Sequence, residues 1–494
     1  MGVAPLGRIA RCAALVGACL AFTAAPAHAV TPPIKHVWVV VLENESAGTT
    51  FGPNSPAPFL SKTLPANGAL LSQYYGTAHE SLGNYIALLS GQGPNPETQA
   101  DCQYYHDVQP GTIGADGQAM GLGCVYPSSV KTLPDQLGAE GLVWKGYMQD
   151  MGNDPARESA TCGHPALSSM DGTQKATAKD SYATRHDPFV YFHSIIDSPL
   201  CKQRVVPLTA LPGDLASAAG TPTFSFITPN LCEDGHDAPC ADGRPGGLAS
   251  ADEFLRTWIP RITGSPAFAD GGLVIVTFDE AENDDASACC GEGPGLSSPL
   301  PGITGMGGGR VGAVALSPYI KPGTVSQVPY NHYSLLRSVS EMFGVPPVGY
   351  AAASGLAVLG GDVFTQPAGP PAGAAPLLQA ATPLAGGGGR PGSGTAGGAV
   401  AGCRSAALPK ARRGRFPRGS LLAQTSVRRS KRQATVTLRL NHVARVWIRW
   451  KHRKVSGRLH ACRVYSLPLP RRAGRLSIEA RVGGGLEQRV LRIR

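Results

Sequence analysis

Two apolar runs of strand length each end in a pair of oxygen-bearing side chains. These runs and the residues that follow them are Val37–Leu42 with Glu43 and Asn44, and Leu273–Phe278 with Asp279 and Glu280. Continuous apolar runs of this length are typical of strands that are buried on both faces of a parallel sheet. Proteins with such sheets bind their substrates at the carboxyl ends of the strands. The pattern therefore predicts an α/β fold with a functional site at one edge of the sheet.

The side chains at these two strand ends are suited to bind a metal ion. Carboxylate and amide oxygens are the ligands that hard divalent cations such as Mg²⁺, Ca²⁺ and Mn²⁺ prefer. Two strands that each end in adjacent ligands of this kind predict a metal site more strongly than either strand does alone. The alternative is that these side chains cap helices or face solvent.

The remainder of the main body alternates between strand-like and helix-like patterns. Further strands are expected over residues 70–76, 142–148, 223–227 and 311–316, and helices over residues 57–66, 133–138, 251–263 and 334–343 and after Ser81. This alternation predicts a mostly parallel sheet flanked by helices. Residues 102–123 and 283–309 are irregular and rich in glycine, so we expect loops there.

The first 29 residues have the pattern of an export signal. Arg8 and Arg11 precede an apolar stretch over residues 13–25, and Ala27-His28-Ala29 has the small residues of a cleavage site. We therefore predict a signal peptide over residues 1–29 and a secreted or cell-envelope protein. Alternatively, the sequence around Cys19 resembles a lipidation site, which would tether the protein to a membrane.

The charge of the chain is divided between two regions. The whole sequence carries a formal charge of +10, yet residues 401–494 contain 25 lysines and arginines against two acids. The stretch before them is rich in glycine, proline and alanine, a composition typical of a flexible linker. The expected organisation is a catalytic domain over residues 30–364, a linker over residues 365–402 and a basic domain over residues 403–494.

The basic region alternates apolar and polar residues, for example over residues 434–440 and 444–450. This spacing predicts strands with a basic outer face, and hence a small all-β domain. Its charge suits an anionic cell-wall polymer or a membrane surface. Nucleic acid is the least expected partner, because the region has neither a recognition helix nor an aromatic stacking motif. The alternative is a soluble appendage whose arginines contact only water.

Cysteine usage agrees with export. Of the 12 cysteines, two lie in the signal, and eight lie in the main body between residues 102 and 290. Outside the cytosol these are expected to form disulfides, although the sequence does not determine the pairing. Adjacent cysteines such as Cys289 and Cys290 seldom bridge each other, and Cys403 and Cys462 could pair near the C-terminus. A zinc site is less favoured, because there is no Cys-x-x-Cys pair.

Ser81 directly precedes an apolar helix. Its hydroxyl would lie among free backbone N–H groups at the positive end of the helix dipole, which also attracts phosphate. This placement suits a nucleophile that attacks phosphorus. The alternative is an ordinary serine cap of the helix. His79 and Asn84, on either side of Ser81, favour the functional interpretation.

Three other groups of residues could contribute to the site. Residues 229–237 follow a strand and contain Asp234 and His236, which could bind a metal or hold a leaving group, or could form an acidic turn held by a Cys232–Cys240 disulfide. Arg185 and His186 are candidate contacts for a substrate phosphate. His332 precedes a helix and could complete the site, although a single histidine in this position is more often a cap or a surface residue.

Taken together, these motifs resemble the bacterial phosphoesterase family, which includes secreted acid phosphatases and phospholipases C and belongs to the alkaline-phosphatase-like superfamily. The residues that carry the resemblance, in chain order, are Glu43-Asn44-Glu45-Ser46, His79-Glu80-Ser81-Leu82-Gly83-Asn84-Tyr85, Pro229-Asn230 with Asp234-Gly235-His236-Asp237, Asp279-Glu280, and Ser317-Pro318-Tyr319 with His332-Tyr333. The resemblance covers roughly residues 35–350 and does not extend to the basic region.

The resemblance implies an alkaline-phosphatase-like fold and a role for each matching residue. Ser81 would be the nucleophile that forms a covalent phospho-enzyme, and Asn84 would help to hold the transferred phosphoryl group. The expected metal ligands are Glu43, Asn44, Asp279 and Glu280. The positions of Asp234, His236 and His332 bind a second metal in some members and contact phosphate in others. The metal would be Mg, Ca, Mn or Zn.

The sequence also departs from the family pattern. Glu80 precedes the nucleophile where a His-Pro-Ser form is commoner, and Gly83 replaces a frequent proline. Ala281-Glu282-Asn283 stands where phospholipase-type members continue toward an Asp-His pair. The last departure argues against phospholipase C activity.

The leading hypothesis is therefore a secreted, metal-dependent phosphatase of phosphate monoesters, in which His236 or His332 protonates the leaving alcohol. A phospholipase C or phosphodiesterase is the alternative within enzymes. An inactive cell-surface or wall-polymer-binding protein is the alternative from another class.

Overall fold

The computed structural model describes Gly2, residues 32–298, 300–303 and 305–369, and seven strands between residues 422 and 493. The chain divides into two compact units, Met1–Leu384 and Ala385–Arg494. Apart from Gly2, the predicted signal over residues 1–29 lies outside the described residues, as do Cys403 and Cys462. No helix of the described part has both the length and the apolar composition needed to cross a bilayer.

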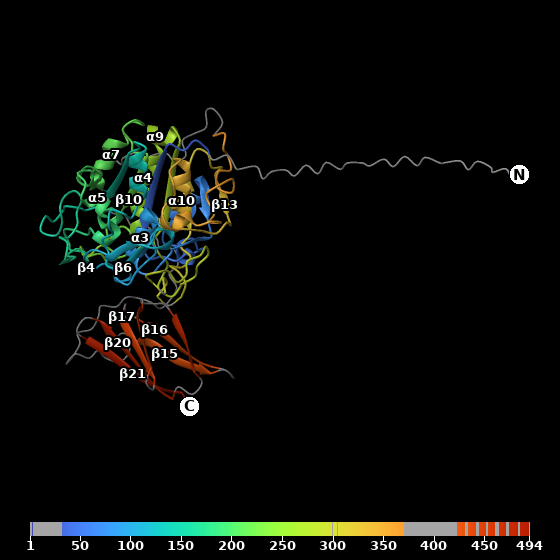
Figure 1. Ribbon diagram of the computed structural model, residues 1–494. Coiled ribbons are helices and arrows are strands. Elements are labelled where there is room, and N and C mark those ends of the chain that lie inside the picture. The colour runs from blue at the N-terminus through green and yellow to red at the C-terminus, as the bar shows by residue number, and fades with distance from the viewer. Residues whose placement is uncertain are drawn as a thin grey trace, which may run out of the picture. The chain divides into compact units, whose positions relative to one another are not determined.

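The first unit is built on a sheet of eight strands (Figure 1). In spatial order these are β13 (Thr324–Ser326), β2 (Ala69–Leu71), β12 (Ala313–Leu316), β11 (Gly272–Phe278), β1 (His36–Leu42), β10 (Phe224–Thr228), β7 (Trp144–Met148) and β9 (Val205–Pro207). All neighbours are parallel except β12, which runs antiparallel to both β11 and β2. The predicted mostly parallel sheet is confirmed.

The two apolar runs form the centre of this sheet. Every residue of β1 and of β11 is buried, as expected for strands covered on both faces. The two strands pair in parallel from His36 opposite Gly272 to Leu42 opposite Phe278. The two strands run in the same direction, and they end on directly paired residues. The residues that follow them therefore lie at the same edge of the sheet.

Helices and helical turns flank the sheet (Figure 1). The α-helices are α1 (Ala47–Thr50), α2 (Leu64–Asn67), α3 (Ser81–Ser90), α4 (Leu133–Ala139), α5 (His193–Ile196), α6 (Leu200–Arg204), α7 (Leu211–Asp214), α8 (Leu248–Thr263), α9 (Pro266–Ala269) and α10 (His332–Met342). The single turns are η1 (Phe59–Thr63), η2 (Thr98–Ala100), η3 (Ala115–Gly117), η4 (Thr184–His186), η5 (Pro188–Tyr191), η6 (Leu208–Ala210) and η7 (Gly349–Ala352). Helix α3 is buried along its whole length and packs against α10.

Some expected elements differ from those observed. The strand predicted over residues 70–76 is two strands, because the chain turns after β2 and β3 (Tyr74–Tyr75) then pairs with β14 (Tyr330–Asn331). The expected loop over residues 102–123 contains β4 (Tyr104–Tyr105), which pairs with β8 (Ser169–Met170), and a hairpin of β5 (Gln109–Ile113) and β6 (Ala119–Leu122). The described residues of 283–309 contain no helix or strand, as predicted.

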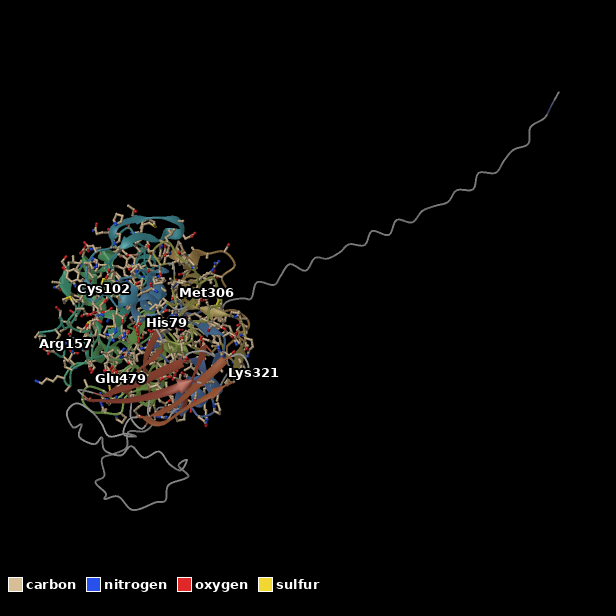
Figure 2. All side chains as sticks on the ribbon, turned by 90° about the horizontal axis from the view of Figure 1, so that it is seen from below. His79, Cys102, Arg157, Met306, Lys321 and Glu479 are labelled. Atoms are coloured by element: carbon tan, nitrogen blue, oxygen red, sulfur yellow. A yellow bond between two sulfur atoms is a disulfide. The ribbon has the colours of Figure 1, made fainter. Side chains whose placement is uncertain are left out.

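Four disulfides are formed in the first unit, whose side chains are drawn in Figure 2. The pairs are Cys102–Cys124, Cys162–Cys201, Cys232–Cys240 and Cys289–Cys290. All eight cysteines of the main body are therefore disulfide-bonded, as expected. Cys289 and Cys290 bridge each other although adjacent cysteines seldom do so, since the other six cysteines of the main body pair among themselves.

The second unit consists of two antiparallel sheets. One contains β15 (Leu422–Arg429), β16 (Gln433–Leu440) and β19 (Val464–Pro470), and the other contains β18 (Arg453–Leu459), β17 (Ala444–Trp450), β20 (Gly474–Val482) and β21 (Gly485–Ile493). Ile478 is fully buried, as the inward position of an alternating strand requires. The predicted small all-β domain is confirmed, including the strands expected over residues 434–440 and 444–450.

Candidate active site

The residues that follow β1 and β11 meet at the sheet edge. The backbone N–H of Asn44 donates to Asp279 Oδ1 at 3.2 Å, and the N–H of Asp279 donates to the carbonyl oxygen of Leu42 at 2.9 Å. Asn44 has a positive φ of 55°, a conformation that asparagine adopts more readily than most residues. Glu43 and Asp279 are both 0 % exposed. The strand-end ligands predicted from the sequence are therefore neighbours.

Ser81 is the first residue of α3 and lies against these carboxylates. Its Oγ donates to Glu43 Oε2 at 2.9 Å, and the side chain is buried. Burial raises the pKa of Asp279 to about 7, and the nearby Ser81 hydroxyl is among the groups that oppose this rise. The amide of Leu82, which was expected to be free at the helix start, donates instead to Asp101 Oδ1 at 3.0 Å.

Tyr85, one turn after Ser81 on α3, connects two of the predicted site residues. Its hydroxyl donates to Glu43 Oε1 at 2.5 Å, and its ring stacks on the ring of His186 with 5.1 Å between centroids and 7° between planes. In the sequence, Tyr85 ends the motif that contains Ser81, but no role in the site was predicted for it. The spacing of four residues from Ser81 is the signal that could have identified it, since such pairs share one face of a helix.

His186 lies between two buried carboxylates. Its Nε2 is 3.4 Å from Glu43 Oε2, and its Nδ1 is 3.3 Å from Asp234 Oδ2. Both acids are 0 % exposed and His186 is 1 % exposed. Burial, followed by the charges of Arg185 and His236, lowers the pKa of His186 well below its usual range, so the ring is neutral.

The carboxyl groups of Glu43 and Asp234 have raised pKa values, because both are buried close to other acids. Burial raises the pKa of Glu43 well above its usual range, and the charges of Asp279 and Asp234 raise it further. Burial is also the main cause of the raised pKa of Asp234. A nearby positive charge is what allows such carboxyls to ionise together.

Arg185 and His236 lie at the rim of this group. The Arg185 guanidinium contacts His236 Nε2 at 3.2 Å, the Gln174 carbonyl oxygen at 3.3 Å and Asp101 Oδ2 at 3.6 Å. His236 Nδ1 faces Asp237 Oδ1 at 2.9 Å, and its side chain is 32 % exposed. His236 therefore reaches solvent, whereas Arg185 is 3 % exposed.

Glu280 and His79 pair with each other. His79 Nδ1 contacts Glu280 Oε2, and His79 Nε2 lies 3.0 Å from the carbonyl oxygen of Asp285. Both residues are buried. The structure thus pairs the predicted metal ligand Glu280 with His79, the histidine that the sequence places two residues before Ser81.

Asn84 and His332 have their polar atoms engaged within the protein. Asn84 Oδ1 accepts from the backbone N–H groups of Thr77 and Ala78 at 2.8 and 2.9 Å, and its Nδ2 donates to Ala78 at 2.8 Å. His332 Nε2 lies 2.6 Å from the carbonyl oxygen of Asp279, and its Nδ1 lies 3.2 Å from the Tyr74 hydroxyl. Burial lowers the pKa of His332 to about 4, so its ring is neutral above that pH.

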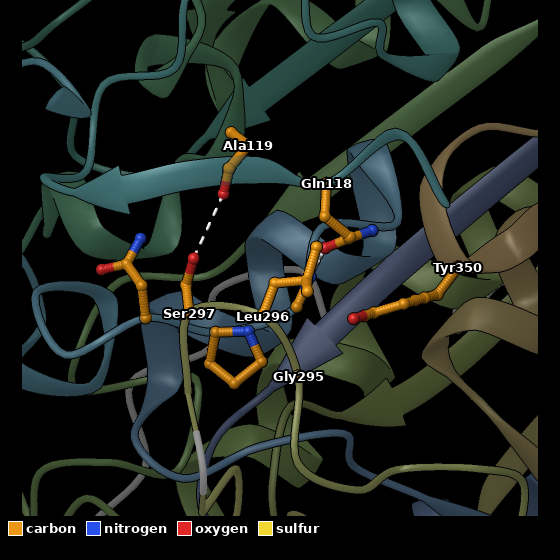
Figure 3. A pocket seen from close by; sticks show the side chains of 9 residues that line it. Gln118, Ala119, Gly295, Leu296, Ser297 and Tyr350 are labelled. Carbon is orange, nitrogen blue, oxygen red and sulfur yellow. Dashed lines mark hydrogen bonds between the residues drawn. The ribbon is translucent and has the colours of Figure 1, made fainter. Parts of the chain in front are cut away.

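A small pocket lies away from these residues (Figure 3). It is lined by Gly93, Pro94, Asn95, Gln118, Ala119, Gly295, Leu296, Ser297 and Tyr350. Ser297 Oγ donates to the carbonyl oxygen of Ala119 at 3.2 Å, and Gln118 Oε1 accepts from Gly93 at 2.7 Å. The first bond attaches the loop over residues 283–309 to the β5–β6 hairpin, and the second attaches the hairpin to the segment after α3. No site residue predicted from the sequence lines the pocket.

Several buried polar atoms at the sheet edge fit a divalent cation. Asn44 Oδ1, Asp279 Oδ2 and Asp234 Oδ2 have no hydrogen-bond partner among the described residues. Ser81 has a single proton and donates it to Glu43, so it leaves the second oxygen of Asp279 without a donor. Buried oxygens of this kind are costly unless they bind a donor or an ion. The donor set therefore matches the hard cation expected from the sequence.

A serine hydroxyl that lies beside clustered oxygen ligands, where parallel strands end, is suited to the hydrolysis of phosphoric esters. The chain belongs to the Phosphoesterase family, whose model matches residues 53–346. This match confirms the resemblance seen in the sequence and the predicted class of enzyme. It includes Ser81, Asp234, Asp279 and His332, and it begins after Glu43 and Asn44.

Two relatives illustrate the range of similar proteins. A phosphatidylinositol-3-phosphatase of Mycobacterium tuberculosis is 26% identical over 357 residues, which cover 70% of this chain and 93% of the relative. An acid phosphatase of Aspergillus fumigatus is 24% identical over 288 residues, which cover 58% of this chain and 51% of that protein. The chain thus spans about half the length of the fungal enzyme. A solved protein of the alkaline phosphatase superfamily from Vibrio parahaemolyticus aligns with 64% of this chain and 69% of its own, at 12% identity and a TM-score of 0.35.

Proposed function

We propose that this chain is a metal-dependent phosphomonoesterase that forms a phosphoserine intermediate at Ser81. The observation that carries the proposal is the 2.9 Å hydrogen bond from Ser81 Oγ to Glu43, which holds a hydroxyl at a helix start beside the strand-end carboxylates. The positive end of the α3 dipole favours an anion at the same point. A phosphate group attracted there would meet the nucleophile.

The proposed reaction has two steps. Ser81 Oγ attacks phosphorus and gives its proton to Glu43, which accepts its hydrogen bond, so a bond forms between oxygen and phosphorus while the bond to the ester oxygen breaks. The alcohol leaves with that electron pair and takes up a proton. Water then attacks the phosphoserine, which releases inorganic phosphate and restores the Ser81 hydroxyl.

The residues around Ser81 have distinct proposed roles. Glu43 accepts the hydrogen bond of Ser81 and so directs a lone pair of Oγ away from the carboxylate. Arg185 lies at the rim of the buried group of carboxylates, and its guanidinium would bind phosphate oxygens. His236 is the stronger candidate for protonating the leaving alcohol, since its side chain is 32 % exposed, whereas His332 is fully buried and burial lowers its pKa to about 4.

Glu43, Asn44 and Asp279 are the residues that would hold the cation, which we propose to be Mg, Ca, Mn or Zn. When bound, a divalent cation favours the ionised form of a serine hydroxyl and neutralises phosphate oxygens. Glu280, His79, Asn84 and His332 are proposed to position these groups. Each of these four makes its polar contacts to the protein itself.

Monoesters are the proposed substrate class, because both relatives described above are named as phosphatases. Comparing p-nitrophenyl phosphate with a bis-ester and with phosphatidylcholine would test this choice. Faster turnover of the diesters would favour the phospholipase C or phosphodiesterase alternative. No turnover of any ester with any divalent cation would favour the inactive binding protein.

We also propose that the enzyme acts outside the cytosol. Its four disulfides are the support, since such bonds persist in oxidising compartments. The export signal over residues 1–29 is part of this proposal. N-terminal sequencing of exported protein is expected to begin near Val30, and a lipid-modified Cys19 would contradict this expectation.

Substitution Ser81→Ala tests the mechanism. We expect kcat to fall by more than about 10³-fold, because the atom that forms the bond to phosphorus is removed. Acid quenching of the native enzyme with labelled substrate should leave phosphate on the peptide that contains Ser81.

Ser90→Ala is the matched control, since Ser90 is the last residue of the same helix, and its hydroxyl donates to the Ile86 carbonyl oxygen at 2.9 Å and accepts from the Gln92 N–H at 3.4 Å. This variant is expected to keep native turnover. Retained turnover in Ser81→Ala, or labelled phosphate at another residue, would refute the nucleophile.

A further inference from the structure

A carboxylate already lies at the start of α3, where the proposed function places a phosphate group. Asp101 Oδ1 accepts a hydrogen bond from the backbone N–H of Leu82 at 3.0 Å. Leu82 follows Ser81 and is the second residue of the helix. The anion that the N–H groups and the dipole of a helix start favour is therefore, in this structure, a side chain of the protein itself.

The Arg185 guanidinium also faces Asp101. Asp101 Oδ2 lies 3.6 Å from Arg185 Nε, and this nitrogen has no hydrogen-bond partner among the described residues. The Arg185 side chain is 4 % exposed, so Nε is a buried donor that an anion at closer range would satisfy. Burial raises the pKa of Asp101, whereas the charge of Arg185 and the N–H of Leu82 lower it, so both contacts favour the ionised carboxylate.

The fold holds Asp101 in this position. The residue follows η2, and the next residue, Cys102, is disulfide-bonded to Cys124. Gln174 Nε2 donates to the carbonyl oxygen of Asp101 at 2.8 Å, and the carbonyl oxygen of Gln174 accepts from Arg185 at 3.3 Å. The φ of Asp101 is 55°, a conformation that aspartate and asparagine adopt more readily than most residues. The backbone therefore directs the carboxylate to the helix start.

We propose that Asp101 competes with phosphate for the start of α3 and for Arg185, and so weakens the binding of phosphate beside Ser81. The inference rests on the proposed function, since it concerns the affinity of the same site for the product of the reaction. A negative charge beside a bound anion lowers the affinity for that anion. Weaker binding of inorganic phosphate limits the inhibition of the enzyme by its own product.

The test is the affinity of Asp101→Asn for inorganic phosphate. Asparagine keeps an oxygen that accepts the N–H of Leu82, and it removes the negative charge. Isothermal titration calorimetry on the full-length protein with a divalent cation present measures the dissociation constant of phosphate. Inhibition of p-nitrophenyl phosphate turnover measures the inhibition constant. We expect both constants to fall by at least about tenfold in the variant, because like charges this close repel strongly outside bulk water.

Asp252→Asn is the matched control. Asp252 also accepts backbone N–H groups at the start of a helical turn, from Phe59 and Leu60, and it pairs with Arg256 at 2.8 Å. This variant should bind phosphate as the native protein does. Asp101→Ser provides a second test if asparagine disturbs folding, because a serine hydroxyl also accepts an N–H at a helix start and carries no charge. It is also expected to bind phosphate more tightly than the native protein.

The outcomes separate this inference from the proposed function. Unchanged or weaker phosphate binding in folded Asp101→Asn would overturn the competition, since the carboxylate would then only cap the helix or orient Arg185. Equally tighter binding in Asp252→Asn would also overturn it, because the effect would come from net charge. Tighter binding in Asp101→Asn, with no labelled phosphate on Ser81 of the native enzyme, would refute the proposed mechanism and leave the competition in place.

Discussion

Tyr85 illustrates how one side chain can align several others. It bonds Glu43 through its hydroxyl and stacks on His186 through its ring, so it orients the proposed metal ligand Glu43 and the neighbouring imidazole. Partners of metal ligands typically change metal affinity 10–100-fold when they are removed. We therefore expect Tyr85→Phe, which keeps the ring and removes the hydroxyl, to weaken binding of the activating cation about tenfold.

The measurement for Tyr85→Phe is turnover as a function of free metal concentration. Saturating metal should restore most of kcat, because the nucleophile is intact. Tyr126→Phe is the control, since Tyr126 is equally buried and its hydroxyl contacts Asn95 at 3.4 Å. An unchanged metal requirement in Tyr85→Phe would remove the positioning role.

At the scale of elements, helix α3 is joined by hydrogen bonds to the turn that precedes it. Asn84 bonds Thr77 and Ala78 and so ties the turn that carries His79 to the helix that begins at Ser81. Asn84→Ala leaves two buried N–H groups without acceptors, and we expect the free energy of unfolding to fall by about 2–5 kcal/mol. Denaturant titration without reducing agent measures this change.

Measuring KM as well as the free energy of unfolding separates two roles for Asn84. A direct contact with phosphate, as the family resemblance implies, predicts a higher KM with little loss of stability. The contacts seen in the structure predict the reverse. Asn67→Ala, which removes a single bond to Thr63, is the control and should cost less than about 1.5 kcal/mol.

The elements that could be predicted from sequence were those whose pattern is local. β1 and β11 have continuous apolar runs, and their register alone brings Glu43 to Asp279. The contact of His186 with Asp234 could not be predicted, because η4 and the loop after β10 are about fifty residues apart and neither has a periodic pattern. The direction of a side chain could not be predicted from the sequence either. His332 lies near the site as expected, but its ring contacts the backbone of Asp279 and the hydroxyl of Tyr74.

At the scale of the whole molecule, two units of opposite charge share one chain. Residues 401–494 carry 25 basic side chains against two acids, and the family match ends at residue 346. Catalysis and surface attachment are therefore expected to be separable. A chain that ends at Leu384 should turn over p-nitrophenyl phosphate within about twofold of the full chain, a change of less than 0.5 kcal/mol in the barrier.

Sedimentation with vesicles that contain an anionic phospholipid tests the hypothesis, based on charge, that the basic region binds a membrane surface. The full chain should sediment with them at low salt and be released as salt screens the attraction, whereas the shortened chain should not sediment. Binding that survives high salt would argue against attachment by charge. Sedimentation of the shortened chain would place attachment in the first unit.

Glu43, Asp234 and Asp279 are all sealed from solvent. Ser81 is buried beside them, so a metal ion, like a phosphate ester, would exchange with bulk water only through local opening of the surrounding structure. Its residence time would then be governed by how often the protein opens locally, and not by the strength of its own bonds. Such a cation would be released only slowly once it is bound, even when the surroundings are poor in metal.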